Sequence, residues 1–273
     1  MKSASLARSA AHLSLFVLLA AAVSSCVVID IFDDDNEVND TRFEATASFR
    51  HVIAAENRFR LRLDGISGDI DVAADPAATD VTIEGDRTVG SESVADAERH
   101  LDNLDVRVET SATEVHVSTI QPEHTLGRSY TVEYRITVPS SFRSTITNVN
   151  GSVVVRGTSG RVEVTHVNGD VTLRDVEADV DVNLVNGLID AEVDPPLAGR
   201  VELTNVNGNV LLSVPAAISA DVTASVTNGS ISVSNLSILD PISTSRTLRG
   251  TLGAGDGVIE LVTVNGNITL RGR

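Results

Sequence analysis

The sequence predicts an all-β domain, a parallel β-solenoid (β-helix-like) with Asn-Gly corners and one short helical insertion. Two patterns predict it. The tripeptide Val-Asn-Gly recurs through the second half of the chain, mostly at intervals of 18 or 21 residues, and apolar residues alternate with polar ones on both sides of each recurrence. The composition agrees, because valine is abundant while aromatic residues make up only 3 %. β-Branched side chains fit a pleated, half-buried surface.

Charge and composition exclude several classes of protein. The chain has 38 acidic and 21 basic residues, which gives a formal net charge of −17. Binding to phosphates requires a cation-rich surface, so we expect no nucleic acid partner. One cysteine excludes a disulfide-stapled scaffold, and the composition is not that of a collagen, a coiled coil or a polytopic membrane protein.

Residues 1–25 are predicted to be a lipoprotein signal peptide. Lys2 and Arg8 precede an apolar run from Leu13 to Val23, and a cationic head before about 7–15 apolar residues is typical of a secretory signal. One alternative is an uncleaved transmembrane helix, because Leu13 to Ile29 makes 17 residues, the lower limit for spanning a bilayer. Simple secretion is the other alternative.

The signal ends in four residues that resemble the bacterial lipoprotein box, namely Val23, Ser24, Ser25 and Cys26. The resemblance implies cleavage before Cys26, a diacylglycerol on its sulfur and acylation of the new amine. Two or three acyl chains make a durable anchor, unlike a single myristoyl chain. We therefore expect a protein of the bacterial cell envelope whose membrane contact is the lipid on Cys26, at the periplasmic side of the outer membrane or at the cell surface.

Residues 26–42 are expected to be the lipidated cysteine and an acidic tether. Six acidic and no basic residues lie between Val27 and Asp40, so the segment should repel itself and stay solvated. Such residues soon after the cysteine resemble the surface-export signals of some Bacteroidetes lipoproteins, and a plain charged spacer is the alternative. The run lacks the spacing of a calcium loop, and we predict no metal site.

Residues 43–273 are expected to form the solenoid domain, and residues 43–140 are its N-terminal part. In Leu61–Val72 the alternation surrounds Ser67, which takes the place of the corner asparagine. Further strand-like runs follow, at residues 81–84, 106–109, 114–118 and 131–138. A short helix is predicted near residues 91–104, where Val94, Ala97, Leu101 and Leu104 share one face, and we expect it to cover one end of the solenoid.

Residues 141–273 are the Asn-Gly repeat part. The intervals between successive corner asparagines are 18, 18, 21, 21 and 37 residues, and we expect the longer ones to contain loops at residues 194–197 and within 234–250. The predicted corner residues are Asn150, Gly151, Asn168, Gly169, Asn186, Gly187, Asn207, Gly208, Asn228, Gly229, Asn265 and Gly266.

Two architectures fit this repeat. Asn-Gly between alternating strands is a strong hairpin signal and would give an antiparallel meander. We prefer a solenoid with coils of about 18–21 residues, because a meander does not require the same turn at equal intervals. Equivalent side chains of stacked coils lie about 4.8 Å apart, so the asparagines should form a ladder of amide hydrogen bonds. A sugar-binding row is the alternative role for them.

Three segments together resemble the bacterial DUF4097 family, whose members are labelled adhesins. They are the Leu61–Val72 strand pair, the Tyr134–Pro139 strand and the ending Leu252–Leu270. The resemblance extends from about Phe43 to Arg273. It implies a β-solenoid on an exported or membrane-anchored protein, and it brings no catalytic residues with it.

No catalytic motif occurs in the sequence, and we predict no catalytic residues and no cofactors. The favoured function is a structural or adhesion-type binding module with an extracellular glycan or protein ligand, and the oligomeric state stays open. One alternative is a carbohydrate-active enzyme, polysaccharide lyase-like or hydrolase-like, and a lesser one is an envelope-stress sensing component. Six outward acids are the enzyme's candidate groups, or carboxylates that divalent cations could bridge: Glu163, Asp170, Asp175, Glu177, Asp179 and Asp181.

Overall fold

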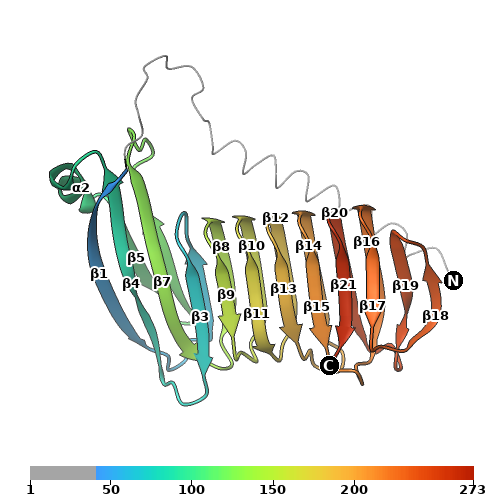
Figure 1. Cartoon of the computed structure of the whole chain (residues 1–273). Coiled ribbons are helices and arrows are strands. Elements are labelled where there is room, and N and C mark those ends of the chain that lie inside the picture. The colour runs from blue at the N-terminus through green and yellow to red at the C-terminus, as the bar shows by residue number, and fades with distance from the viewer. Residues whose placement is uncertain (1–40) are drawn as a thin grey trace. The chain divides into compact units, whose positions relative to one another are not determined.

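The computed structural model describes residues 41–273, which fold as two facing β-sheets and one short helix (Figure 1). Sheet A has ten strands, in the spatial order β1 (Phe43–Ala54), β4 (Asp80–Ser91), β7 (Ser129–Pro139), β3 (Ile70–Asp75), β9 (Val153–Arg156), β11 (Val171–Val176), β13 (Ile189–Val193), β15 (Val210–Val214), β21 (Ile268–Gly272) and β17 (Ile231–Ser234). Sheet B has eleven, in the order β18 (Ile238–Ser243), β19 (Thr247–Leu252), β16 (Ala220–Asn228), β20 (Gly257–Asn265), β14 (Arg200–Asn207), β12 (Val180–Asn186), β10 (Val162–Asn168), β8 (Arg143–Asn150), β2 (Arg60–Asp64), β6 (Glu114–Ile120) and β5 (Asp105–Thr110).

The middle of the domain is the predicted parallel solenoid. Each coil contributes one strand to sheet B and the next to sheet A, and an Asn-Gly corner joins the two. Strands of neighbouring coils pair in parallel and in register, so that Asn168 stands opposite Asn150 on one side and Asn186 on the other. The all-β solenoid prediction is therefore confirmed.

Both ends of the domain depart from a purely parallel solenoid. At one end β1 pairs antiparallel with β4, β4 with β7, and β5 with β6. At the other end β19 pairs antiparallel with β16 and with β18. The connections β5–β6 and β18–β19 span only residues 111–113 and 244–246. Connections this short can join only antiparallel neighbours, since a parallel pair needs a crossover of a dozen or more residues.

The order of the last coils differs from the order of the sequence. Strands β20 and β21, the last two in the chain, lie between the coil β14–β15 and the coil β16–β17 (Figure 1). The prediction of a loop within residues 234–250 is wrong, because this segment contains β18 and most of β19, which extend sheet B beyond β16. Residues 194–199 do lie between strands, and Leu197 is exposed there.

The core lies between the sheets and is filled mainly by valine, isoleucine and leucine from alternate strand positions. On β10 and β12 the inward residues Val162, Val164, Val180 and Val182 are buried. The inward residues of β17, Ile231 and Val233, are only half-buried, because β17 is the edge strand of sheet A. Full burial of such a side chain contributes about 1.5–3 kcal/mol, so the repeated alternation stabilises every coil in the same way.

The predicted helix is α2 (Val94–Leu101), which packs against β1 and β4 at one end of the domain (Figure 1). Its N-cap is Ser93, whose hydroxyl oxygen accepts a hydrogen bond from the backbone N–H of Asp96. Ala97 and Leu104 are buried as an apolar face requires, whereas Val94 is 48 % exposed. The apolar face therefore begins one turn later than the sequence suggested.

Candidate functional site

The six corner asparagines lie in one exposed row along the solenoid. Five of the side-chain amides donate to the asparagine amide oxygen of a neighbouring coil, and we call this row of six the Asn ladder. Its donor–acceptor distances are 3.0 Å from Asn168 to Asn150, 2.8 Å from Asn186 to Asn168, 2.9 Å from Asn207 to Asn186, 2.8 Å from Asn265 to Asn207 and 2.8 Å from Asn228 to Asn265. At the first rung Asn150 donates to the hydroxyl of Ser67, at 3.3 Å.

The glycines that follow the asparagines allow the coils to stack this closely. All six have positive φ, from 113° to 153°. At Gly169 φ is 134°, and a Cβ atom would lie 1.8 Å from the carbonyl oxygen of Gly151 in the coil before it. Both the backbone conformation and the contact exclude a side chain here.

A second row of side chains lies beneath the ladder, at the inward position two residues before each corner asparagine. Asn148, His166, Asn205 and Thr263 occupy four of these positions and are buried. Asn205 donates to the carbonyl oxygen of Gly187 at 2.7 Å, and Thr263 donates to that of Gly208 at 3.0 Å. His166 Nε2 lies 2.7 Å from the carbonyl oxygen of Gly151. The side chains of this inner row therefore provide hydrogen-bond partners for the backbone carbonyl groups of the corner glycines.

The outer face of sheet B beside the ladder is free of charge over six coils. We call this surface the neutral strip; it consists of the Asn ladder and two further rows of outward side chains. The first row is Thr147, Thr165, Asn183, Thr204, Val262 and Ser225, and the second is Val149, Val167, Val185, Val206, Val264 and Thr227. These side chains are half-buried or exposed. In a protein with net charge −17, eighteen adjacent uncharged positions form a distinct surface.

The six outward acids do not converge on one site. Asp170 and Asp179 accept hydrogen bonds from backbone N–H groups of the next coil, those of Leu188 at 2.8 Å and Arg200 at 2.9 Å. Asp175 has a positive φ of 51° at an irregularity in β11. The hydrogen bonds of Asp170 and Asp179 and the backbone conformation of Asp175 therefore help to define the shape of the coils.

Of the six acids, Glu163 and Asp181 stand directly opposite each other, on β10 and β12. Burial raises the pKa of Asp181, and the nearby carboxylate of Glu163 raises it further while Arg161 opposes the shift. Arg161 also donates to Glu163 at 2.6 Å, and Asn183 donates to Asp181 at 2.8 Å. Each carboxylate therefore already accepts a hydrogen bond from a side chain two residues away in the sequence.

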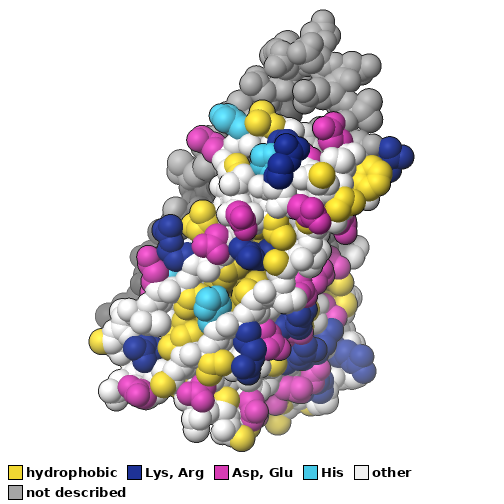
Figure 2. Space-filling model, turned by 90° about the vertical axis from the view of Figure 1, so that its left-hand side faces the viewer, with side chains coloured by type: hydrophobic (Ala, Val, Ile, Leu, Met, Phe, Trp, Pro, Cys, Tyr) yellow, Lys and Arg dark blue, Asp and Glu magenta, His cyan; other side chains and the backbone are white. Residues whose placement is uncertain are grey.

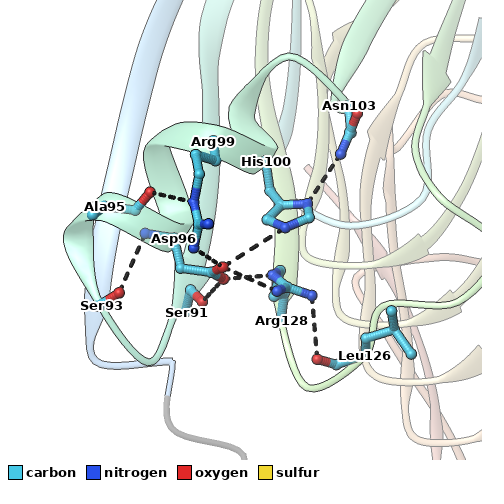
Figure 3. Close-up of polar contacts among 9 residues, drawn as sticks. All are labelled: Ser91, Ser93, Ala95, Asp96, Arg99, His100, Asn103, Leu126 and Arg128. Carbon is cyan, nitrogen blue, oxygen red and sulfur yellow. Dashed lines mark hydrogen bonds and ion pairs between the residues drawn. The ribbon is translucent and has the colours of Figure 1, made fainter.

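A second polar cluster surrounds the buried carboxylate of Asp96 in the first turn of α2 (Figure 3). Arg128, in the loop before β7, donates to both its oxygens, at 2.6 and 3.1 Å, and the exposed Arg99 donates at 2.8 Å. The hydroxyl of Ser91 donates to the same carboxylate. These hydrogen bonds, led by that of Arg128, hold the pKa of Asp96 well below its usual range. The cluster fastens α2 to β4 and to the loop before β7.

The end of the domain that carries β1 and α2 has a mixed surface. Figure 2 views this end and shows acidic, basic and histidine side chains interspersed with apolar ones. The edge strand β1 exposes Phe43 and Val52. This end therefore has no patch of predominantly positive or negative charge that would select a charged ligand. The neutral strip is the more regular of the two surfaces.

Several sequence predictions concern residues that the structure does not describe. Cys26, its preceding residues Val23, Ser24 and Ser25, and the acidic tether up to Asp40 lie outside the described residues. Within residues 41–273, no helix has the length and apolar character needed to cross a membrane, and no group of three or more metal-binding side chains comes together.

Two features of the structure, the inner row and the neutral strip, are not among the predictions from the sequence. The inner row left a signal, since polar residues such as Asn148 and His166 occupy positions that alternation assigns to the core. The neutral strip also left one, because no charge occurs at the two outward positions before each corner asparagine. Neither signal shows in any single repeat, and each needs the coils to be superimposed.

Comparison with known proteins gives one family and a set of distant structures. The family model described as Toastrack DUF4097 matches residues 55–271. No curated protein matches the sequence. A proposed cell adhesion protein from Clostridium sporogenes is 12 % identical with a TM-score of 0.43, and the similarity covers 84 % of this chain and 100 % of that one. A proposed adhesin from Bacteroides fragilis is 11 % identical (TM-score 0.30; 83 % and 97 % covered), and a proposed lipid-binding protein from Parabacteroides distasonis is 9 % identical (TM-score 0.25; 84 % and 96 % covered).

Proposed function

Since this chain belongs to the Toastrack DUF4097 family, we propose that it is a non-catalytic binding module of the bacterial cell envelope. Its ligand is an extended, uncharged glycan that lies along the neutral strip. Lipid on Cys26 anchors the module to the membrane, and the acidic segment between Val27 and Asp40 separates the two.

The observation that carries this proposal is the absence of charge from the neutral strip. The rows offer hydroxyls, methyl groups and amides at the same place on every coil, about 4.8 Å apart. A polymer with a repeating unit can therefore meet several coils at once, and weak contacts that are made together bind far more tightly than any one of them. A row of equivalent side chains along a sheet face suits such a ligand better than a small molecule, which is usually bound in a concave pocket.

Binding is tested with two substitutions in one coil. Thr165 lies in the neutral strip on β10, and Thr172 lies on the outer face of β11 in sheet A; both are half-buried. Full-length protein in detergent is applied to an array of neutral and acidic glycans. We expect Thr165→Arg to lose at least about tenfold in affinity for the neutral glycan that binds, because it places a charge in the strip, while Thr172→Arg binds like the unchanged protein. Equal binding by both variants, or binding to acidic glycans alone, contradicts the proposal.

The anchor is tested separately. We expect Cys26→Ser to abolish lipid attachment and cleavage, so that only the precursor accumulates, and globomycin to leave the precursor of the unchanged protein unprocessed. A Cys26→Ser protein that is still processed and still fractionates with membranes excludes the lipid anchor.

A carbohydrate-active enzyme is the second candidate, and one observation favours it. The pKa of Asp181 is raised, and Asp181 lies opposite a second carboxylate, that of Glu163. General acid catalysis by a pair of carboxyl groups requires one of them to have a raised pKa. Against it, both carboxylates are bonded to neighbours on an outer sheet face. Glycans that bind are incubated with the protein and with the Glu163→Gln and Asp181→Asn variants. Saturable binding without turnover supports the binding module, and turnover that either substitution abolishes establishes the enzyme.

A further inference from the structure

The last rung of the Asn ladder differs from the others in its backbone. At five corners the glycine N–H donates to the backbone carbonyl of the asparagine in the next coil, at 2.8–3.1 Å: Gly151 to Asn168, Gly169 to Asn186, Gly187 to Asn207, Gly208 to Asn265 and Gly266 to Asn228. Gly229 belongs to the coil β16–β17, beyond which sheet A has no further strand in the described chain. Within residues 41–273 its N–H has no acceptor, and it is exposed where the other five glycines are half-buried.

The side chain of the last rung is also held less firmly. An interior asparagine such as Asn186 donates to one neighbour and accepts from the other. Asn228 donates to Asn265 at 2.8 Å, and its own amide oxygen accepts no hydrogen bond from the described residues. The amide and the following glycine N–H together make three hydrogen bonds at an interior corner, whereas at Asn228 they make one. The backbone carbonyl of Asn228 still accepts from the N–H of Gly266, at 3.0 Å, as the asparagine carbonyls of the other corners accept from a neighbouring coil.

We propose that Asn228 is a site of spontaneous deamidation in the folded protein. The backbone nitrogen of Gly229 loses its proton to solvent base and attacks Cγ of Asn228. The Cγ–Nδ2 bond breaks, ammonia leaves, and a cyclic succinimide remains. Water then opens either of the two ring C–N bonds and yields aspartate or isoaspartate, so that the net change is an amide plus water giving a carboxylic acid plus ammonia.

The ladder protects the other five corners by holding both reacting groups. The attacking nitrogen must give up its hydrogen bond to the next coil, and the amide must leave its two neighbours. Each net hydrogen bond contributes about 1 kcal/mol, so two additional bonds slow ring closure roughly thirtyfold. Glycine follows the asparagine at every corner and leaves the approach to the backbone nitrogen unobstructed. The difference in deamidation rate between the corners therefore comes from their hydrogen bonds and not from the Asn-Gly sequence that they share.

The product changes the end of the neutral strip. A carboxylate at position 228 introduces the first charge into its eighteen positions, and isoaspartate also lengthens the backbone at the corner between β16 and β17. This inference concerns the chemistry of the chain itself and stands whether or not the strip binds a glycan.

Peptide mapping by mass spectrometry tests the proposal. Full-length protein in detergent is incubated in mildly alkaline buffer, and each Asn-Gly peptide is followed over time. Asn150 is the matched control, because both Asn150 and Asn228 are followed by Gly-Ser. We expect the peptide with Asn228 to be modified at least about tenfold faster than that with Asn150, and we expect the two rates to become equal in urea. Equal rates in the folded protein, or faster reaction of Asn228 in urea as well, overturn the proposal. Asn228→Gln should remove the early product and leave the slower ones unchanged.

Discussion

Single glycines decide whether neighbouring coils can stack. Gly169 combines a φ of 134° with a place where a Cβ would meet the carbonyl oxygen of Gly151. We expect Gly169→Val to lower the free energy of unfolding by at least about 3 kcal/mol, since a β-branched residue opposes both features. Thr172→Ser, on the outer face of the same coil, should change it by less than about 0.5 kcal/mol. Urea denaturation of both variants measures the difference, and equal midpoints would contradict this account of the corner.

The buried carboxylate of Asp96 should make stability depend on acidity. Its hydrogen bonds from Arg128 and Ser91 lower its pKa in the folded state. The ionised form therefore stabilises the fold above the unfolded-state pKa of about 3.9, and this contribution is lost as the pH falls below it. We expect the unchanged protein to lose stability on acidification below about pH 4 more steeply than Asp96→Asn. Thermal unfolding across the acid range tests this, and parallel curves would remove Asp96 from the explanation.

At the scale of the element, a few hydrogen bonds to the carboxylate of Asp96 hold α2 in place. Arg128 and Arg99 both donate to Asp96, but the side chain of Arg128 is 18 % exposed and that of Arg99 is 73 % exposed. We expect Arg128→Met to leave a buried carboxylate without its main partner and to release the helix. Limited proteolysis should then cut near residues 92–104 in Arg128→Met but not in Arg99→Met. Protection in both variants would mean that apolar packing alone holds α2.

The hairpin β18–β19 shows where element-level inference from the sequence ends. Alternation marks both of its strands weakly, because β18 contains Asp240 with a positive φ and then Pro241. Proline and a bulge are typical of an edge strand, and β18 is the edge of sheet B. The proline and the bulge interrupt the alternation of apolar and polar residues, and this is why the sequence predicts a loop here.

For the whole molecule, the coil period and the inward face could be predicted and the spatial order could not. Equal intervals between Asn150, Asn168 and Asn186 predict stacking, because equivalent residues must then coincide. Every coil carries the same apolar pattern, however, so nothing in the pattern distinguishes Asn228 from Asn265 as the neighbour of Asn207. The 37-residue interval leaves both orders open, and only pairing in three dimensions selects one.

The continuity of the Asn ladder and neutral strip through this reordered end is the central claim, and cross-linking tests it directly. In a Cys26→Ser background, Asn207→Cys is combined either with Asn265→Cys or with Asn228→Cys, and each protein is oxidised. Neighbouring strands are about 4.8 Å apart and strands two positions apart about 9.6 Å, whereas a disulfide needs Cα atoms about 4.4–6.8 Å apart. The account predicts a disulfide between positions 207 and 265 and none between 207 and 228. A disulfide between 207 and 228 alone would show that the coils follow chain order and would contradict it.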